Sequence, residues 1–230
     1  MDHAQYFRRQ LQVYPISDEG DPQSGSSHLH YRVSVPILRA IVKSWTKDQG
    51  KSLTFDDWTA TLDSLYHGES IEERSIAGML LAQFKKHRER LSLDTLDSWL
   101  DQLEGWKEVD STCQSAVTAP ELLARWSEWD SYLERLTSDA NINKRRASLV
   151  LSVKPIRDSD DLRLWGRVAT NVERLTHETD KLITKAISWV LREATKSNHV
   201  RVAEFVDDHA HALPALVIRE VRKKLTTGKK

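Results

Sequence analysis

The sequence predicts an all-α protein, and three observations support this prediction. Glycine and proline, the two residues that most weaken helices, account for only 8 and 6 of the 230 residues. Apolar residues recur at helical spacing along most of the chain, and no segment shows the alternation and flanking turn residues of a strand. Helix-start motifs, in which a hydroxyl side chain precedes a carboxylate by three residues, occur repeatedly.

The predicted elements begin with a short helix over residues 3–13. The Ser- and Gly-rich stretch that follows, residues 17–27, is typical of a flexible connection. Three capping motifs place later helix starts after Thr54, Ser70 and Thr118, each followed three residues on by Asp or Glu. The further helices that we expect are 36–48, 55–67, 71–91, 93–103, 107–117, 120–136, 142–154, 159–174, 178–197, 199–208 and 214–226.

Short helices with tight links are compatible with a globular bundle or with an α-solenoid of stacked antiparallel pairs. Helix pairs of about 35–45 residues have the length of HEAT-like units, although self-similarity between the pairs is weak. A solenoid would also offer a long concave face to a rod-like ligand. We therefore predict a single domain over 1–230 of about six HEAT-like pairs. Within it, residues 1–30, a helix and a flexible stretch, match the HEAT-like pattern poorly, and residues 226–230 form a basic tail.

Composition argues against several classes of protein. No apolar run approaches the ~18 residues of a membrane span, and the first residues lack the apolar core of a secretion signal. Cys113 is the only cysteine, so an intramolecular disulfide cannot form and we expect a cytoplasmic protein. The pairs His28-x-His30 and His209-x-His211 lack further ligands, and no phosphate-binding glycine loop is present. We expect neither a metal nor a cofactor.

Charge is distributed unevenly, although the formal net charge is zero. Residues 1–138 hold 22 acidic and 15 basic side chains, whereas residues 139–230 hold 12 acidic and 19 basic ones. This asymmetry suggests that a polyanion contacts the C-terminal part of the chain. Ordinary drift in surface charge is the alternative interpretation.

The helix expected over 178–197 carries an apolar stripe and, opposite it, a basic face. At 100° per residue, four cations fall within roughly 60° of one another, and Trp189 lies at the border of the two faces. A tryptophan beside cations suits a sugar-phosphate backbone, but it equally suits packing at the edge of the stripe. The cations are Lys181, Lys185, Arg192 and Lys196, and the stripe is Leu182, Ile183, Ala186, Ile187, Val190, Leu191 and Ala194.

Two more segments carry side chains suited to chemistry or binding. Trp106 and Asp110 are four residues apart, so they share a helix face beside an apolar stripe. An aromatic wall next to a carboxylate could hold a sugar, although by spacing alone a core Trp with a surface Asp is favoured. In the run Lys144-Arg145-Arg146, Arg146 lies on the apolar side of its helix and needs an anionic partner. That partner is an internal carboxylate or a bound phosphate.

Taken together, these segments resemble the AlkD-type DNA alkylation repair glycosylases, which are HEAT-like repeat alkylpurine DNA glycosylases. The matching motifs, in order, are Trp106-x-x-x-Asp110, Asn141-Ile-x-x-x-Arg146-Ala147 and Lys185-Ala-Ile-x-Trp189-Val-Leu-Arg-Glu. Weaker similarity extends over residues 30–225. The chain departs from the family in the stretch before Pro36, which usually contains an aromatic residue and glycine, and at Asn143, where an aromatic is usual.

The resemblance implies a monomer whose concave basic surface binds duplex DNA in the nucleoid. It implies a monofunctional enzyme that releases cationic N3- or N7-alkylpurines without a base-flipping pocket, a metal or a cofactor. By position, Asp110 would be the catalytic carboxylate, Trp106 and Trp189 would pack against the deoxyribose and backbone, and Arg146 would hold a phosphate. The other expected DNA contacts are Lys144, Arg145, Lys181, Lys185, Arg192 and Lys196.

Two other functions compete with the glycosylase. One is a non-catalytic relative that binds DNA of unusual structure, and the other is a helical-repeat scaffold that binds protein. A relative that only binds DNA has no need of Asp110, and the basic face of the 178–197 helix disfavours the scaffold. The retained set of motifs therefore favours the enzyme.

Overall fold

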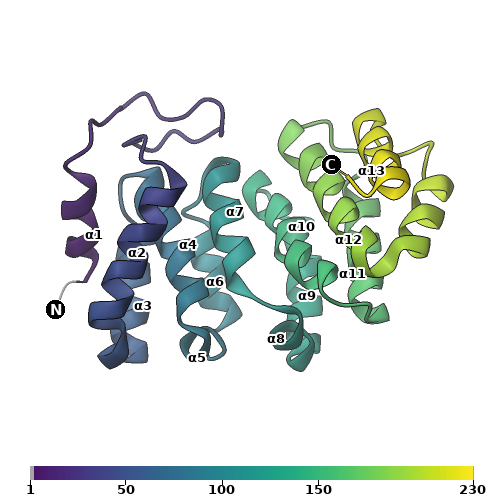
Figure 1. Cartoon of the computed structure of the whole chain (residues 1–230). Helices are drawn as coiled ribbons and strands as arrows, with labels where there is room; N and C mark the ends of the chain where they lie inside the picture. The colour runs from purple at the N-terminus through teal and green to yellow at the C-terminus, as the bar shows by residue number, and fades with distance from the viewer. Residues whose placement is uncertain (1–2, 230) are drawn as a thin grey trace. The chain divides into compact units, whose positions relative to one another are not determined.

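The computed structural model describes residues 3–229, and within that range it is all-helical, with thirteen α-helices, one short 3₁₀-helix and no strand. The all-α prediction is confirmed, and neighbouring helices pack in pairs as in HEAT-like solenoids (Figure 1). No described helix is both long and apolar enough to cross a membrane. The chain divides into two compact units, Met1–Ala116 and Val117–Lys230. The predicted single domain stays a prediction.

The first unit is built around α4, which packs against α2, α3 and α7. Because helices surround it, α4 is buried over most of its length, including the charged residues Glu72, Glu73 and Arg74. Large aromatics fill the core, and Tyr66 stacks on Trp99 with ring centroids 4.9 Å apart. The elements are α1 (Ala4–Leu11), α2 (Val35–Gln49), the 3₁₀-helix Gly50–Ser52, α3 (Phe55–Tyr66), α4 (Ile71–Gln83), α5 (Lys85–Arg88), α6 (Leu93–Leu100) and α7 (Gly105–Ala116).

The second unit is built around α10, which packs against α8, α9, α11 and α12. The last helix of the chain, α13, packs against α12. The predicted apolar stripe of the 178–197 helix is buried as expected, apart from Leu182, which is half-buried. The elements are α8 (Ala119–Ala124), α9 (Trp126–Leu136), α10 (Ile142–Arg157), α11 (Leu162–Leu175), α12 (Lys181–Asp208) and α13 (Ala215–Thr227).

The helix starts follow their predicted caps. The Thr54 side chain accepts a hydrogen bond from the Asp57 amide, and Ser70 forms a reciprocal capping box with Glu73. The Thr118 amide donates to Glu121 at 2.8 Å. Each motif satisfies amide groups that the first helical turn leaves without a partner.

Helix continuity differs from the prediction at four places. The predicted helix 71–91 breaks at Phe84 (φ −112°, ψ 67°), whose ring stacks on His87 and packs against Trp45. The predicted helix 120–136 breaks at Arg125 (φ −119°, ψ 41°). The two helices expected on either side of residue 198 are the arms of α12, which is kinked at Asn198. Finally, α10 continues through Pro155 to Arg157, and the proline, which removes one backbone donor, is followed by only two helical residues.

Candidate functional site

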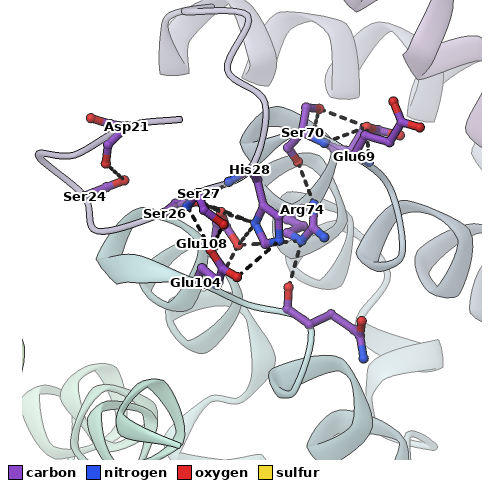
Figure 2. Close-up of polar contacts among 12 residues, drawn as sticks. Asp21, Ser24, Ser26, Ser27, His28, Glu69, Ser70, Arg74, Glu104 and Glu108 are labelled. Atoms are coloured by element: carbon purple, nitrogen blue, oxygen red, sulfur yellow. Dashed lines mark hydrogen bonds and ion pairs between the residues drawn. The ribbon is translucent and has the colours of Figure 1, made fainter. Parts of the chain in front are cut away.

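Residues 20–28, here called the strap, cross the N-terminal end of α7. Their Gly- and Ser-rich composition predicts flexibility, but several side chains hold them in place (Figure 2). Ser26 Oγ donates to Glu108 Oε1 at 2.6 Å, and His28 Nδ1 lies 3.0 Å from the same oxygen. The amide and hydroxyl of Ser27 both donate to Glu104 Oε2, at 2.8 and 2.6 Å.

Glu108 is the centre of this polar cluster and is fully buried. Its carboxylate also accepts from the Glu104 amide at 2.8 Å and lies 3.6 Å from Arg74 Nε. Burial lowers the pKa of Arg74, and the neighbouring Glu108 carboxylate opposes that shift. Partial burial alone would raise the pKa of Glu104, but the hydrogen bonds from Ser27 and the nearby charges lower it overall.

Trp106, in the first turn of α7, is positioned by the strap. Its indole N–H donates to the Gln23 carbonyl at 3.1 Å, and its amide donates to the Ser24 carbonyl at 3.0 Å. The preceding Gly105 has φ +66°, and a side chain there would collide with the Ser24 backbone. Lys107 adds an ion pair with Asp21 at 2.5 Å. These contacts fix the indole while leaving 39% of Trp106 exposed.

Trp106 and Asp110 line the same groove, which has a volume of about 1030 Å³. Its lining residues come from the loop before α2 and from α2, α4 and α7, and because α4 packs against both of the other helices, the groove lies over α4. Asp110 is half-buried, and Val109 behind it is fully buried. The spacing argument therefore placed the tryptophan and the carboxylate on one face correctly, and that face is open.

The groove also contains cations that sequence reasoning did not single out as functional. Arg32, Arg39 and Lys43 are exposed and line it. Arg39 and Lys43 are four residues apart on α2, a spacing that could have indicated a shared basic face. Arg32 lies in the loop before α2, where no periodic signal exists. Asp110, an exposed indole and three exposed cations thus line one open groove.

In the second unit, the cations of the Lys144-Arg145-Arg146 run are largely engaged within the protein. Arg146 is 4% exposed and lies on the apolar side of α10, as predicted, where its guanidinium donates to the Leu182 carbonyl. Arg145 pairs with Glu178 at 2.5 Å, and Lys144 is also buried. The partner of the Arg146 guanidinium in this contact is a backbone carbonyl inside the protein, and its pairing with an internal carboxylate stays a prediction. The phosphate-binding role of the run stays a prediction.

The basic face of α12 is smaller than expected. Lys181, Lys185 and Lys196 are exposed, and Trp189 is half-buried at the edge of the apolar stripe. Arg192 instead turns back toward its own helix, where Nε donates to Ser188 Oγ at 3.1 Å. Its Nε also lies 3.5 Å from Glu220 of α13, so the guanidinium is mostly covered. Of the four cations predicted for this face, the three lysines are therefore the ones that are exposed to solvent.

Histidine and acidic side chains within residues 3–229 form no group arranged to hold a metal ion. His28 and His30 each face a buried carboxylate, that of Glu108 and that of Glu72 respectively. Both histidines tie the loop before α2 to the helices beneath it.

Two comparisons with known proteins found a match, and both matches concern DNA alkylation repair. A family model described as DNA alkylation repair enzyme matches residues 26–225. Among solved structures, the chain is similar to a predicted DNA alkylation repair enzyme from Enterococcus faecalis, with a TM-score of 0.71 and 18% sequence identity. The match covers 92% of this chain and 99% of that one, and at this identity it shows a shared fold. No curated protein sequence matches the chain.

Proposed function

The chain belongs to the DNA alkylation repair enzyme family, and from this premise we propose that it is a monofunctional DNA glycosylase. Its substrates are N3- and N7-alkylated purines in duplex DNA, from which it hydrolyses the N-glycosidic bond without a base-flipping pocket. One observation carries the proposal: Trp106 and Asp110 lie side by side in an open groove that also contains three exposed cations. The protein would act as a monomer on DNA in the nucleoid.

The chemistry of these lesions fits the residues present. Alkylation at N3 or N7 makes the purine cationic, so it can leave with the electron pair of the glycosidic bond and become neutral. No acid is then needed to protonate the base. Positive charge develops on the sugar, where the Asp110 carboxylate stabilises it, and the electron-rich face of Trp106 adds to that effect.

Water completes the reaction by adding to the sugar carbon and losing a proton. Asp110 is the base placed to accept that proton, directly or through a second water. The products are a free alkylpurine and an abasic site. The mechanism uses only water and the side chains of the groove.

The remaining predicted residues enter as DNA contacts. In this proposal Trp189 packs against the backbone beside the lesion, and the exposed lysines Lys181, Lys185 and Lys196 contact phosphates. Arg145, Arg146, Lys144 and Arg192 have internal interactions in the structure, so their phosphate contacts would require these side chains to exchange partners on binding. A tryptophan next to cations is the combination that binds nucleic-acid backbones.

A base-release assay tests the proposed activity. The protein is incubated with a duplex that carries one 7-methylguanine, and the free base and the alkali-labile abasic site are both measured. We expect release of 7-methylguanine and no release from the matched unmodified duplex. Binding without release would favour a non-catalytic DNA-structure-binding protein, and the absence of both would favour a protein-interaction scaffold.

A further inference from the structure

Arg32 adopts a backbone conformation that arginine rarely takes. Its φ is +55°, and it is the one non-glycine residue with positive φ among residues 3–229. In this left-handed region Cβ crowds the neighbouring carbonyl oxygen, so glycine is the residue that normally occupies it. Such strain persists only where the surrounding structure enforces it.

A single buried carboxylate enforces the conformation of Arg32. The Tyr31 amide donates to Glu72 Oε2 and the Val33 amide donates to Glu72 Oε1, both at 3.1 Å. Glu72 is 2% exposed, and His30 Nε2 lies 3.4 Å from Oε1. The two amides on either side of Arg32 are therefore held by the two oxygens of one side chain.

This arrangement directs the Arg32 side chain to the groove. Val33 is buried on one side of the turn, whereas Arg32 is exposed and lines the groove that contains Trp106 and Asp110. The guanidinium makes no hydrogen bond or ion pair within the described part of the chain. Arg32 therefore adds strain to the fold and has no partner among residues 3–229 that would offset it.

We infer that Arg32 is a substrate-positioning residue that binds a backbone phosphate and so holds the DNA strand in the groove beside Asp110. A guanidinium offers two parallel N–H donors to a phosphate, which fixes orientation as well as distance. Arg39 and Lys43 extend the same positive lining along α2. The inference deepens the proposed function and rests on it for the identity of the ligand.

The decisive variant is Arg32→Gly, because it should raise the melting temperature of the protein while weakening its binding to duplex DNA. Glycine relieves the left-handed backbone, so the melting temperature should rise. Loss of the guanidinium should weaken binding to an undamaged duplex about fivefold at low salt and reduce the magnitude of the log Kd against log salt slope by about one. The matched control is Lys47→Ala, which removes an exposed α2 cation that does not line the groove.

Three results would overturn the inference. Unchanged duplex binding by Arg32→Gly shows that the guanidinium does not contact DNA, and a lower melting temperature shows that it supports the fold instead. An equal loss of binding in Lys47→Ala shows that only general charge matters. If the wild type binds duplex DNA but releases no 7-methylguanine, the glycosylase proposal fails, while the binding comparison still decides the role of Arg32.

Discussion

At the scale of single residues, the groove of the first unit combines two electrostatic tasks that oppose each other. Binding a phosphate backbone requires cations, which Arg32, Arg39 and Lys43 supply at the groove surface. Breaking a glycosidic bond requires an anion beside the sugar, and Asp110 is the half-buried carboxylate that lines the groove. Mutation of the cations should therefore affect binding first, and mutation of Asp110 should affect the chemical step first.

Substitution of Trp189 tests whether the second unit contributes to excision, as predicted. The ring is half-buried at the edge of the apolar stripe, so Trp189→Ala should destabilise the protein by less than the ~3 kcal/mol typical of a core tryptophan. Excision of 7-methylguanine should fall by at least about tenfold, because the backbone contact that orients the sugar is lost. Chemical denaturation and single-turnover base release on the same variant measure the two effects.

A matched control for this variant is Trp165→Ala. Trp165 is also half-buried in the second unit, and its ring packs against Phe205 at a centroid distance of 5.8 Å. It should lose comparable stability and keep wild-type excision. If both variants lost the same amount of excision activity, the loss in Trp189→Ala would be explained by reduced stability and not by a lost DNA contact.

At the scale of elements, the strap is the part of the fold that most directly shapes the candidate site. Glu108→Gln should release it, because Arg74 loses its fully buried anionic partner and one of the two oxygens that accept from Ser26 and from the Glu104 amide is replaced by a donor. Breaking a buried ion pair from one side costs about 3–5 kcal/mol, so a large fall in the free energy of unfolding is expected. Denaturant titration measures this fall, and hydrogen exchange of residues 20–28 reports the release of the strap.

Glu104→Gln is the control for the strap experiment. The Glu104 side chain is 42% exposed, so its interactions are screened by solvent and its loss should cost at most about 1 kcal/mol. If the two variants lost equal stability, the strap would not depend on the buried carboxylate. If Glu108→Gln left the exchange of residues 20–28 unchanged, the other contacts of the strap, such as Ser27 with Glu104 and Asp21 with Lys107, would be enough to hold it.

The elements also show which features a single sequence can reveal. The stripe and capping motifs located most helices, and the boundary predicted at residue 198 coincides with the kink at Asn198, because these signals are local. The order in the strap depends on Glu104 and Glu108, which lie about eighty residues further along the chain. The local composition of a segment does not indicate such distant partners, so a Ser- and Gly-rich segment is predicted to be flexible. The hydrogen bonds that the amides on either side of Arg32 donate to Glu72 could not be predicted from the sequence for the same reason.

At the scale of the whole molecule, the net charge of a sequence segment is a poor predictor of the charge that lines the groove. The acidic excess of residues 1–138 and the basic excess of residues 139–230 suggested that a polyanion contacts the C-terminal part of the chain. Several of these carboxylates are buried and bound internally, including Glu72, Glu73 and Glu108. Their charge is offset by Arg8, Arg74 and the amides that they accept from. The exposed lining of the groove is therefore more basic than the sequence count indicates.

Duplex binding should depend steeply on salt. If the exposed cations of the groove and of α12 contact about four phosphates, the log Kd against log salt plot should have a slope magnitude of about 3–4. Lys185→Ala should reduce that magnitude by about one, since Lys185 is exposed on α12. Fluorescence anisotropy over a range of salt concentrations gives the slope. A Kd independent of salt would support the protein-scaffold alternative.

The central claim is that Asp110 stabilises positive charge on the sugar, and one comparison tests it most directly. Asp110→Asn keeps the shape of the side chain and removes its charge, so single-turnover release of 7-methylguanine should fall by about 10²–10³-fold. On the same variant, duplex binding should be unchanged or slightly tighter, because a negative charge near phosphates is gone, and the protein should still fold with a cooperative thermal melt. Wild-type excision by Asp110→Asn would remove Asp110 from the mechanism, and a collapsed melt would make it a structural residue.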